Sequence, residues 1–242
     1  MQPIISSSDR VADLQALQGL VAAAHELTAP LTAISHIASA LGDGSLGPNV
    51  DQKKWLEYMQ LSADRTLRLM QSLVTAYNLN GQQELNLQPI NVTQVCEEVA
   101  HEVVPFAAIQ KQTLQVNLGQ RSQLVVGDKE LLHTILFTIL DNALRSTPPE
   151  TTVRLGQRRQ LDTVRIDVQD HGPTLRPSDI TKLQQRLGGH MQPLGARGGG
   201  GLGIYIAQQL AEAMGGSIGV GRAVAGARLH LDLLYSRQLR LV

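Results

Sequence analysis

Apolar residues recur at alternating steps of three and four along residues 11–41. The positions that form this repeat are Leu17, Leu20, Ala24, Leu27, Leu31, Ile34, Ala38 and Leu41. Such spacing draws one apolar stripe along a helix and is typical of a coiled-coil seam. Three glycines and a proline between residues 42 and 48 then interrupt the pattern. The pattern therefore predicts one long amphipathic helix that ends near residue 41.

A second stripe predicts another helix over residues 51–80. Its members are Leu56, Met59, Ala63, Thr66, Met70, Leu73 and Tyr77. Two amphipathic helices joined by a short loop form an antiparallel hairpin, whose apolar stripe stays partly exposed in a single chain. Pairing two hairpins about a two-fold axis buries the stripe in a four-helix bundle. We therefore expect a homodimer.

After a polar stretch at residues 81–88, the chain changes to a mixed pattern of helices and strands. Helices are expected over residues 92–110, 131–144 and 203–214, and Asp128 suits the N-cap of the second of these. Strands are expected over residues 113–118, 123–126, 152–157, 163–168, 217–220 and 227–234. This succession predicts an α+β sandwich, with helices on one face of a mixed sheet.

The expected fold class is α+β: a long helical hairpin that forms a dimeric four-helix bundle, followed by an α/β sandwich domain. An N-terminal segment, residues 1–10, precedes the hairpin of residues 11–80. Residues 81–88 form the expected linker, and residues 89–242 the second domain.

Composition narrows the classes of protein to consider. Hydrophobic residues make up 43% and charged residues 17% of the 242 residues, which suits an ordered globular protein. Basic and acidic residues number 21 each, so no general attraction to nucleic acid or to a membrane is expected. No apolar run approaches the roughly 20 residues of a membrane span, and residues 1–10 lack the order of a signal peptide. We expect a soluble, cytoplasmic chain without membrane contact. The single cysteine, Cys96, excludes an internal disulfide.

Residues 25–31, His-Glu-Leu-Thr-Ala-Pro-Leu, form the first group with candidate chemistry. His25 follows the seam residue Ala24, so it is expected on the flank of the bundle, where neutral imidazole can accept a phosphoryl group. The neighbouring carboxylate of Glu26 can take the ring proton. Pro30 lacks an amide donor and bends a helix. An ordinary exposed histidine is the alternative interpretation.

A second group lies on the apolar helix, where residues 140–145 read Leu-Asp-Asn-Ala-Leu-Arg. The amide oxygen of Asn142 suits Mg²⁺, which prefers oxygen ligands. Arg145 lies three residues further on, on nearly the same helix face, from which it can reach a phosphate. A plain polar helix face is the alternative.

Two further groups contain glycine. Asp170 follows an expected strand and can accept a hydrogen bond from an exocyclic amine such as that of adenine, while Gly172 permits a tight turn. Residues 198–203, Gly-Gly-Gly-Gly-Leu-Gly, run directly into a helix, where backbone N–H groups suit a phosphate. A strand-end turn and a flexible loop are the alternatives. The glycine spacing fits neither a P-loop nor a dinucleotide-binding motif.

With these four groups in this order, the chain resembles the sensor histidine kinases of two-component systems from about residue 10 to residue 234. Residues 25–31 match the phosphoacceptor box, residues 140–145 half of the asparagine box, and residues 170–172 and 199–203 the two glycine boxes. The resemblance implies a dimerisation and histidine phosphotransfer domain, followed by a Bergerat-type ATP-binding domain.

The resemblance also implies the function. It indicates an ATP-dependent protein histidine kinase that uses Mg²⁺, phosphorylates His25 with Glu26 as the base, and transfers the phosphoryl group to an aspartate of a response regulator. The residues implied to bind the nucleotide are Asn142, Arg145, Asp170, Gly172, Gly199, Gly201, Leu202 and Gly203, and Asn142 also holds the metal. The alternative is a non-catalytic dimeric scaffold or histidine phosphotransfer protein with a degenerate nucleotide site. A serine-kinase anti-sigma factor would share the ATP domain but would not need the hairpin or His25. No sensor domain is recognisable, so the chain is either the cytoplasmic part of a longer receptor or a small stand-alone kinase.

The chain departs from the family's pattern at several positions. Ala29 stands where the family usually has Thr or Asn, which helps to position water for phosphatase activity, so we expect a poor phosphatase. Thr138 stands where the asparagine box usually begins with Asn or Glu, and Ser146 replaces a common aromatic residue. Thr174 replaces a glycine, and the phenylalanine-containing box is missing, so the ATP lid over residues 183–201 is expected to be short or unusual.

Overall fold

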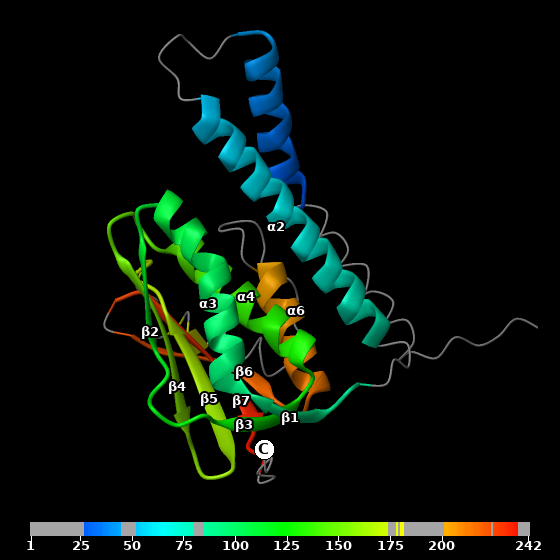
Figure 1. Cartoon of the computed structure of the whole chain (residues 1–242), viewed down its shortest axis with the longest axis vertical. Coiled ribbons are helices and arrows are strands. Elements are labelled where there is room, and N and C mark those ends of the chain that lie inside the picture. Colours follow the sequence, from blue (N-terminus) through cyan, green and yellow to red (C-terminus); the bar gives the residue numbers. More distant parts are fainter. Residues whose placement is uncertain are drawn as a thin grey trace, which may run out of the picture. The chain divides into compact units, whose positions relative to one another are not determined.

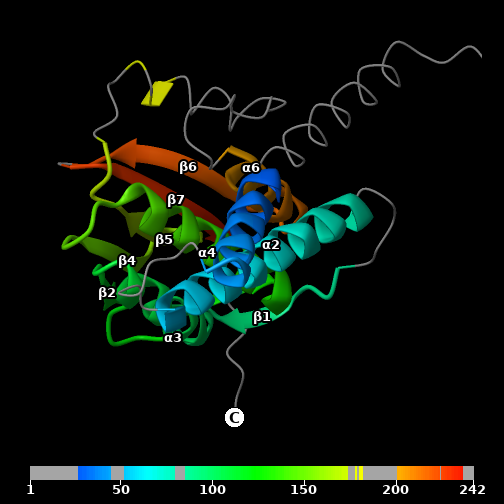
Figure 2. The same cartoon turned by 90° about the horizontal axis from the view of Figure 1, so that it is seen from above.

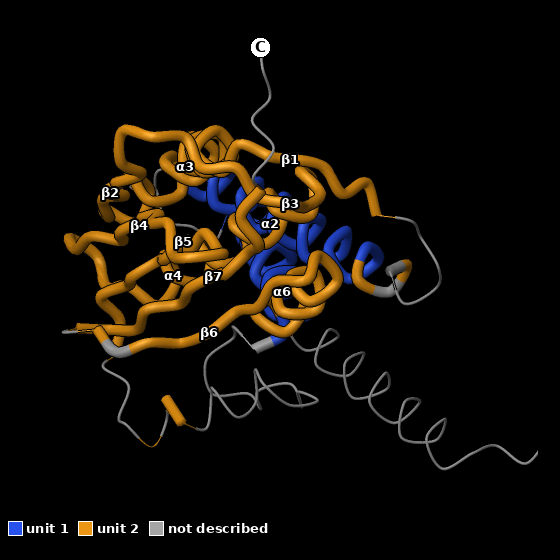
Figure 3. The backbone as a smooth tube through the Cα atoms, turned by 90° about the horizontal axis from the view of Figure 1, so that it is seen from below, with its two compact units in different colours: residues 1–75, 192–202 blue, residues 76–191, 203–242 orange. Residues whose placement is uncertain are grey.

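A computed structural model describes residues 27–44, 52–79, 85–173, 178, 180–181, 201–223 and 225–236 (Figure 1). The chain divides into two compact units, which Figure 3 shows in different colours. Residues 1–75 and 192–202 belong to the first unit, and residues 76–191 and 203–242 to the second. No helix among the described residues is long and apolar enough to cross a membrane.

Two helices make up most of the described part of the first unit. One covers residues 27–42, and the other, α2, covers Gln52–Leu79, so both follow the predicted seams. Several seam side chains remain in solvent: Leu31 is 53% exposed, Leu56 55% and Met70 55%. The dimer that would cover these side chains stays a prediction.

Hydroxyl groups occupy part of the buried side of α2. The side chain of Ser62 donates to the carbonyl of Tyr58 at 2.8 Å, and that of Thr66 donates to the carbonyl of Ser62 at 2.7 Å. Such bonds to the preceding turn satisfy a buried hydroxyl without a partner from another element. The side chains of α2 that are buried, Ser62, Thr66 and Ser72, are therefore polar, whereas its described apolar side chains stay at least partly exposed.

The second unit is a two-layer α/β sandwich (Figures 1 and 2). Its main sheet has the order β2-β4-β5-β7-β6. The strands are β2 (Thr113–Asn117), β4 (Thr152–Arg159), β5 (Thr163–Gln169), β6 (Ser217–Arg222) and β7 (Ala227–Leu234). Strand β2 pairs with β4 in parallel and all other neighbours pair antiparallel, so the sheet is mixed as predicted.

A separate two-stranded sheet joins β1 (Gln88–Asn91) to β3 (Leu124–Gly127) in antiparallel register. The strand at β3 was predicted, whereas β1 was not. Strand β1 has only four residues and contains Pro89, and proline lowers the strand signal because it cannot donate to a sheet. Strand β1 begins at Gln88, the last residue of the predicted linker.

Three helices cover one face of the main sheet (Figures 1 and 2): α3 (Val92–Ile109), α4 (Lys129–Ser146) and α6 (Gly201–Ala213). Asp128 caps α4 as predicted, because its Oδ1 accepts the N–H groups of Glu130 at 3.0 Å and Leu131 at 3.2 Å. Aliphatic side chains fill the space between the layers. Those that are fully buried include Leu132, Ile135, Leu136, Ile139, Leu140, Leu155, Ile166, Ile206, Leu210 and Leu231.

Candidate functional site

One face of α4 carries Asn142, the residue predicted to bind the metal ion. Thr138, Asn142 and Ser146 follow each other at intervals of four residues, so their side chains share a helix face at steps of about 6 Å. Ser146 donates its hydroxyl to the carbonyl of Asn142 at 3.0 Å, and Thr138 donates to the carbonyl of Thr134 at 2.8 Å. The side-chain amide of Asn142 makes no hydrogen bond within the part of the chain that the structure describes. That amide is therefore available to a ligand.

The N-terminus of α6 approaches this face at Thr138. A Cβ atom at Gly203 would lie 3.0 Å from the methyl carbon Cγ2 of Thr138, so a larger residue would force the Thr138 methyl group to shift by a few tenths of an ångström. The preceding Leu202 is buried, at 1% exposure. The first N–H groups of a helix have no partner within that helix, and helix N-termini favour negative charge. Gly203 of α6 therefore lies beside the face of α4 that Thr138 and Asn142 share.

Asp170 follows directly on β5 and is 7% exposed. Its Oδ1 accepts the N–H groups of Gly172 at 2.9 Å and Ala227 at 2.8 Å, and its own N–H donates to the carbonyl of Ala227 at 3.0 Å. No described residue donates a hydrogen bond to its Oδ2. The carboxylate is thus fixed through one oxygen and can accept from a ligand through the other.

Two glycines allow this carboxylate and the end of α4 to lie close together. A Cβ atom at Gly172 would lie 2.5 Å from the backbone oxygen of Ser146, so only glycine fits between the Asp170 turn and α4. A Cβ atom at Gly226 would overlap Oδ1 of Asp170, and Gly226 also has a φ of +70°. The predicted tight turn at Gly172 is therefore present.

The turn after β5 is also tied to the loop between α4 and β4. The N–H of His171 donates to the hydroxyl oxygen of Thr147 at 3.2 Å, and its ring nitrogen Nδ1 lies in hydrogen-bond contact with the carbonyl oxygen of Thr152. These contacts hold Asp170 at a fixed place beside the last turn of α4.

The structure places several of the candidate residues on α4 or near it. Asn142 lies on α4, Gly172 and Gly203 pack against α4, and Asp170 accepts the N–H of Gly172. Arg145 is exposed on the last turn of α4, Gly201 opens α6, and Leu202 follows it.

Other candidates lie elsewhere. His25, Glu26 and Gly199 fall outside the described residues, and their roles stay predictions. Ala29 is exposed on the helix of residues 27–42. Gly226 and Ala227 were not predicted, because a lone glycine between alanines carries no distinctive signal.

Comparison with known proteins finds similar sequences and structures. A profile described as histidine kinase-, DNA gyrase B-, and HSP90-like ATPase matches residues 127–236. The adaptive-response sensory kinase SasA of Synechocystis sp. is 27% identical over 226 residues, which are 89% of this chain and 58% of SasA. The sensor protein kinase PmrB of Pseudomonas aeruginosa is 29% identical over 214 residues, which are 87% of this chain and 43% of PmrB. The chain spans about half the length of the curated relatives that it matches.

Solved structures share the fold. The Acinetobacter baumannii histidine kinase AdeS aligns with a TM-score of 0.59 at 18% identity, over 88% of this chain and 98% of AdeS. Histidine kinase ThkA, solved in complex with response regulator protein TrrA, aligns with a TM-score of 0.65 at 16% identity, over 95% of this chain and 64% of ThkA. The five-stranded sheet with helices on one face matches the ATP-binding fold of histidine kinase catalytic domains.

Proposed function

We propose that this chain, which belongs to the sensor histidine kinases, phosphorylates its own His25 from ATP and passes the phosphoryl group to an aspartate of a response regulator. The observation that carries the proposal is the arrangement along α4. Gly203 of α6 lies against Thr138, the side-chain amide of Asn142 is unengaged, and Gly172, which packs against Ser146, donates to the fixed carboxylate of Asp170. These are the groups that a nucleotide needs for its phosphates, its metal ion and its base.

Recognition of the adenine ring is assigned to Asp170. Its Oδ2 would accept a hydrogen bond from the exocyclic amine of adenine, while Oδ1 stays bound to the backbone of Gly172 and Ala227. A carboxylate fixed in this way favours adenine over guanine, which presents a carbonyl oxygen at that place. Sites built to hydrogen-bond one substrate group discriminate strongly against analogues that lack it.

Binding of the nucleotide's phosphates is assigned to the N-terminus of α6. Backbone N–H groups of Gly201, Leu202 and Gly203 would face the phosphate oxygens, together with the glycine loop that includes Gly199. Arg145 would add a charge-assisted contact.

Mg²⁺ fits the residues present, because Asn142 offers a free amide oxygen on the same helix face. In nucleotide sites this ion usually takes one or two protein oxygens and completes its shell with phosphate oxygens and water. Bound there, it would neutralise part of the charge of the phosphates.

In this proposal His25 accepts the phosphoryl group and Glu26 accepts the ring proton. These two roles rest on the match of residues 25–31 to the phosphoacceptor box. A ring nitrogen of His25 attacks the γ-phosphorus of ATP, a P–N bond forms, the bond to the β-phosphate oxygen breaks, and ADP leaves. The ring proton passes to the carboxylate of Glu26. The phosphoryl group then moves from the ring nitrogen to a carboxylate oxygen of the regulator's aspartate.

The chain is proposed to act as a homodimer in the cytoplasm. The exposed seam residues Leu31, Leu56 and Met70 support the dimer, because a second hairpin would cover them. The solved complex of ThkA with a response regulator supports a receiver domain as the partner.

A non-catalytic scaffold with a degenerate nucleotide site is the second candidate. One observation favours it. Thr138, at the place where the asparagine box usually begins, turns its hydroxyl back to the carbonyl of Thr134.

Incubation with radiolabelled ATP separates the two candidates. A kinase acquires a label that acid removes and alkali leaves, as expected of phosphohistidine, and Asn142→Ala abolishes the labelling. A scaffold binds its partner but acquires no label at any Mg²⁺ concentration.

A further inference from the structure

Helix α4 ends at a pair of prolines, and this leaves backbone acceptors without their usual donors. In a helix the carbonyl of residue i accepts from the N–H of residue i+4. For Leu144 that donor would belong to residue 148, which is Pro148 and has no N–H. Leu144 is 2% exposed, so water is a poor substitute. An unpaired buried carbonyl is costly, and another donor is needed here.

Gln112 supplies that donor from a distant part of the chain. Its Nε2 donates to the carbonyl of Leu144 at 2.8 Å and also to the carbonyl of Thr147. The side chain is buried, at 7% exposure, and its Oε1 is buried without a hydrogen-bond partner. A glutamine placed with one end unsatisfied indicates that the two bonds at its other end determine its position.

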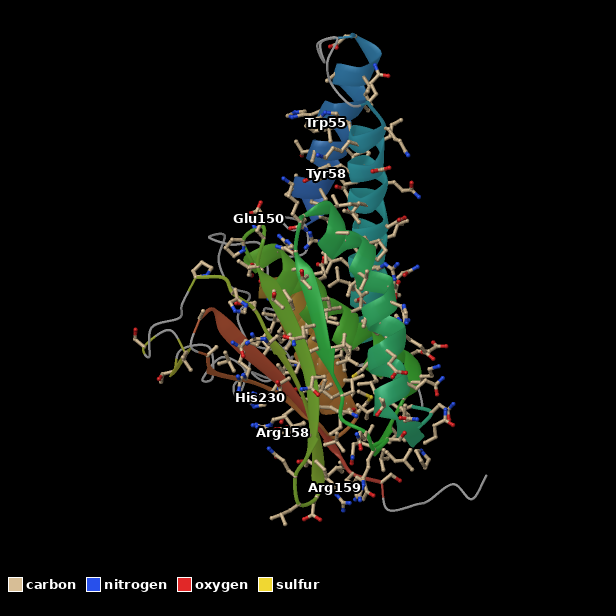
Figure 4. The ribbon with its side chains drawn as sticks, turned by 60° about the vertical axis from the view of Figure 1, so that its left-hand side comes forward. Trp55, Tyr58, Glu150, Arg158, Arg159 and His230 are labelled. Atoms are coloured by element: carbon tan, nitrogen blue, oxygen red, sulfur yellow. The ribbon has the colours of Figure 1, made fainter. Side chains whose placement is uncertain are left out.

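The backbone around Gln112 is shaped to deliver this contact. Lys111 has a φ of 55° and Glu150 (labelled in Figure 4) has a φ of 64°, both in the left-handed region that side-chain-bearing residues rarely adopt. The N–H of Glu150 donates to the carbonyl of Lys111 at 2.7 Å. Strained conformations of this kind persist where surrounding contacts enforce them.

The end of α4 in turn locates the base-binding carboxylate. Gly172 packs against the backbone oxygen of Ser146, and the hydroxyl oxygen of Thr147 accepts the N–H of His171. Asp170 lies between these contacts and the strand that precedes it. A shift of the last turn of α4 would therefore move Asp170 relative to Asn142.

We infer that Gln112 is a positioning residue for nucleotide selection. By standing in for the missing N–H of Pro148, it holds the end of α4 and so the Oδ2 of Asp170 at the place where it discriminates adenine from guanine. The inference rests on the proposed nucleotide site.

The test compares the affinities of the full chain for ATP and GTP by calorimetry. Gln112→Met keeps the length of the side chain and removes both donors. It should weaken ATP binding by about tenfold, the equivalent of about 1.4 kcal/mol, and change GTP binding little. A variant that had only lost stability would weaken both nucleotides alike.

Gln157→Met is the matched control. Gln157 also donates through Nε2 to two acceptors, the hydroxyl of Thr93 at 2.7 Å and the carbonyl of Leu118 at 2.6 Å, and it also has a buried, unbonded Oε1. It does not contact the end of α4 through these bonds. The control should lower the melting temperature but keep the ratio of ATP to GTP affinity.

A rescue variant tests whether Gln112 replaces the N–H that Pro148 lacks. Pro148→Ala restores an N–H four residues after Leu144, and Pro148 is exposed, so the change should be tolerated. Combined with Gln112→Met, it should recover the affinity ratio. It should also reverse the faster amide exchange that Gln112→Met causes at residues 145–147 in the nucleotide-free protein.

Three results would overturn the inference: an unchanged ratio in Gln112→Met, an equal loss of the ratio in Gln157→Met, or no recovery with Pro148→Ala. Failure of the unaltered chain to bind ATP would instead overturn the proposed function, and the inference with it.

Discussion

The two units of the chain differ in how far their apolar side chains are buried. In the second unit, α4 and the strands against it bury side chains such as Leu132, Ile139 and Leu231 completely. On the helices of the first unit, the seam residues Leu31, Leu56 and Met70 stay more than half exposed, while Ser62 and Thr66 are buried. One unit therefore has a core of its own, and the other presents a stripe that a partner would complete. Changes in the two units should accordingly affect assembly and nucleotide binding separately.

The largest effect is expected when glutamates replace two leucines of the apolar seam. Leu27→Glu with Leu31→Glu should dissociate the dimer or unfold the hairpin. Losing each buried leucine costs about 2–5 kcal/mol, and burying a carboxylate adds its desolvation. Sedimentation measures assembly, and calorimetry should find ATP affinity within about twofold of the unaltered chain, as for independent sites. Ser39→Glu, off the seam, is the control, and a double variant that remains dimeric contradicts the bundle.

The converse change is Asp170→Asn in the second unit. It keeps an oxygen that can hold the backbone of Gly172 and Ala227 but places an amide N–H₂ where adenine donates. Because hydrogen bonds to charged groups are worth about 1.5–3 kcal/mol, ATP and ADP should bind about 10- to 100-fold more weakly. Sedimentation should show the dimer unchanged. Asp167→Asn, on the same strand, is the control, and unaltered affinity in Asp170→Asn would remove Asp170 from the site.

A smaller loss is expected when Gly226 becomes alanine. The added Cβ would overlap Oδ1 of Asp170, and the φ of +70° disfavours any side chain there. Gly119→Ala is a matched control, because Gly119 has a φ of +72° but nothing within 4 Å of its added Cβ. Both variants should lose about 1 kcal/mol of stability from the backbone, and only Gly226→Ala should also weaken ATP binding. Equal effects of the two on calorimetric affinity would show that the contact with Asp170 is unimportant.

The smallest effect is a pH dependence in the sheet of the second unit. His230 on β7 (labelled in Figure 4) lies over Gly219, and burial, followed by the charge of Arg165, holds the pKa of His230 below its ordinary value. The folded protein therefore binds fewer protons than the unfolded chain near the ordinary histidine pKa of about 6.5, so stability falls as pH drops through that range. His230→Gln should reduce the fall of the melting temperature between about pH 7 and pH 5.5. An unchanged fall of the melting temperature in His230→Gln would contradict this assignment.

Features with a local pattern could be predicted from the sequence. The two seams, one through Leu31 and one through Leu56, predicted both helices of the first unit. Asp128 predicted the start of α4, because caps and apolar periods act over a few residues. The start of α6 near Gly203 and the turn at Gly172 were also predicted, from glycines beside a helix or a strand, whereas the approach of α6 to α4 was not. These signals come from residues that are neighbours in the chain.

Features that depend on distant contacts could not be predicted in this way. Gln112 contacts a carbonyl 32 residues away, and Gly226 matters only because Asp170 lies against it, 56 residues earlier in the chain. Neither residue differs in its local sequence from an ordinary glutamine or glycine. Strand β1 was missed for a related reason, since its pairing with β3 outweighs the low strand preference of Pro89.

The most direct test of the account is the labelling of His25→Gln beside His36→Gln, which alters an exposed histidine on the helix of residues 27–42. Radiolabelled ATP measures phosphorylation, and calorimetry measures ATP affinity in the same preparations. Because His25 is not among the residues assigned to nucleotide binding, His25→Gln should acquire no label while its ATP affinity stays within about twofold of the unaltered chain. His36→Gln should be labelled normally. Acid-labile label on the His25→Gln chain would contradict the account.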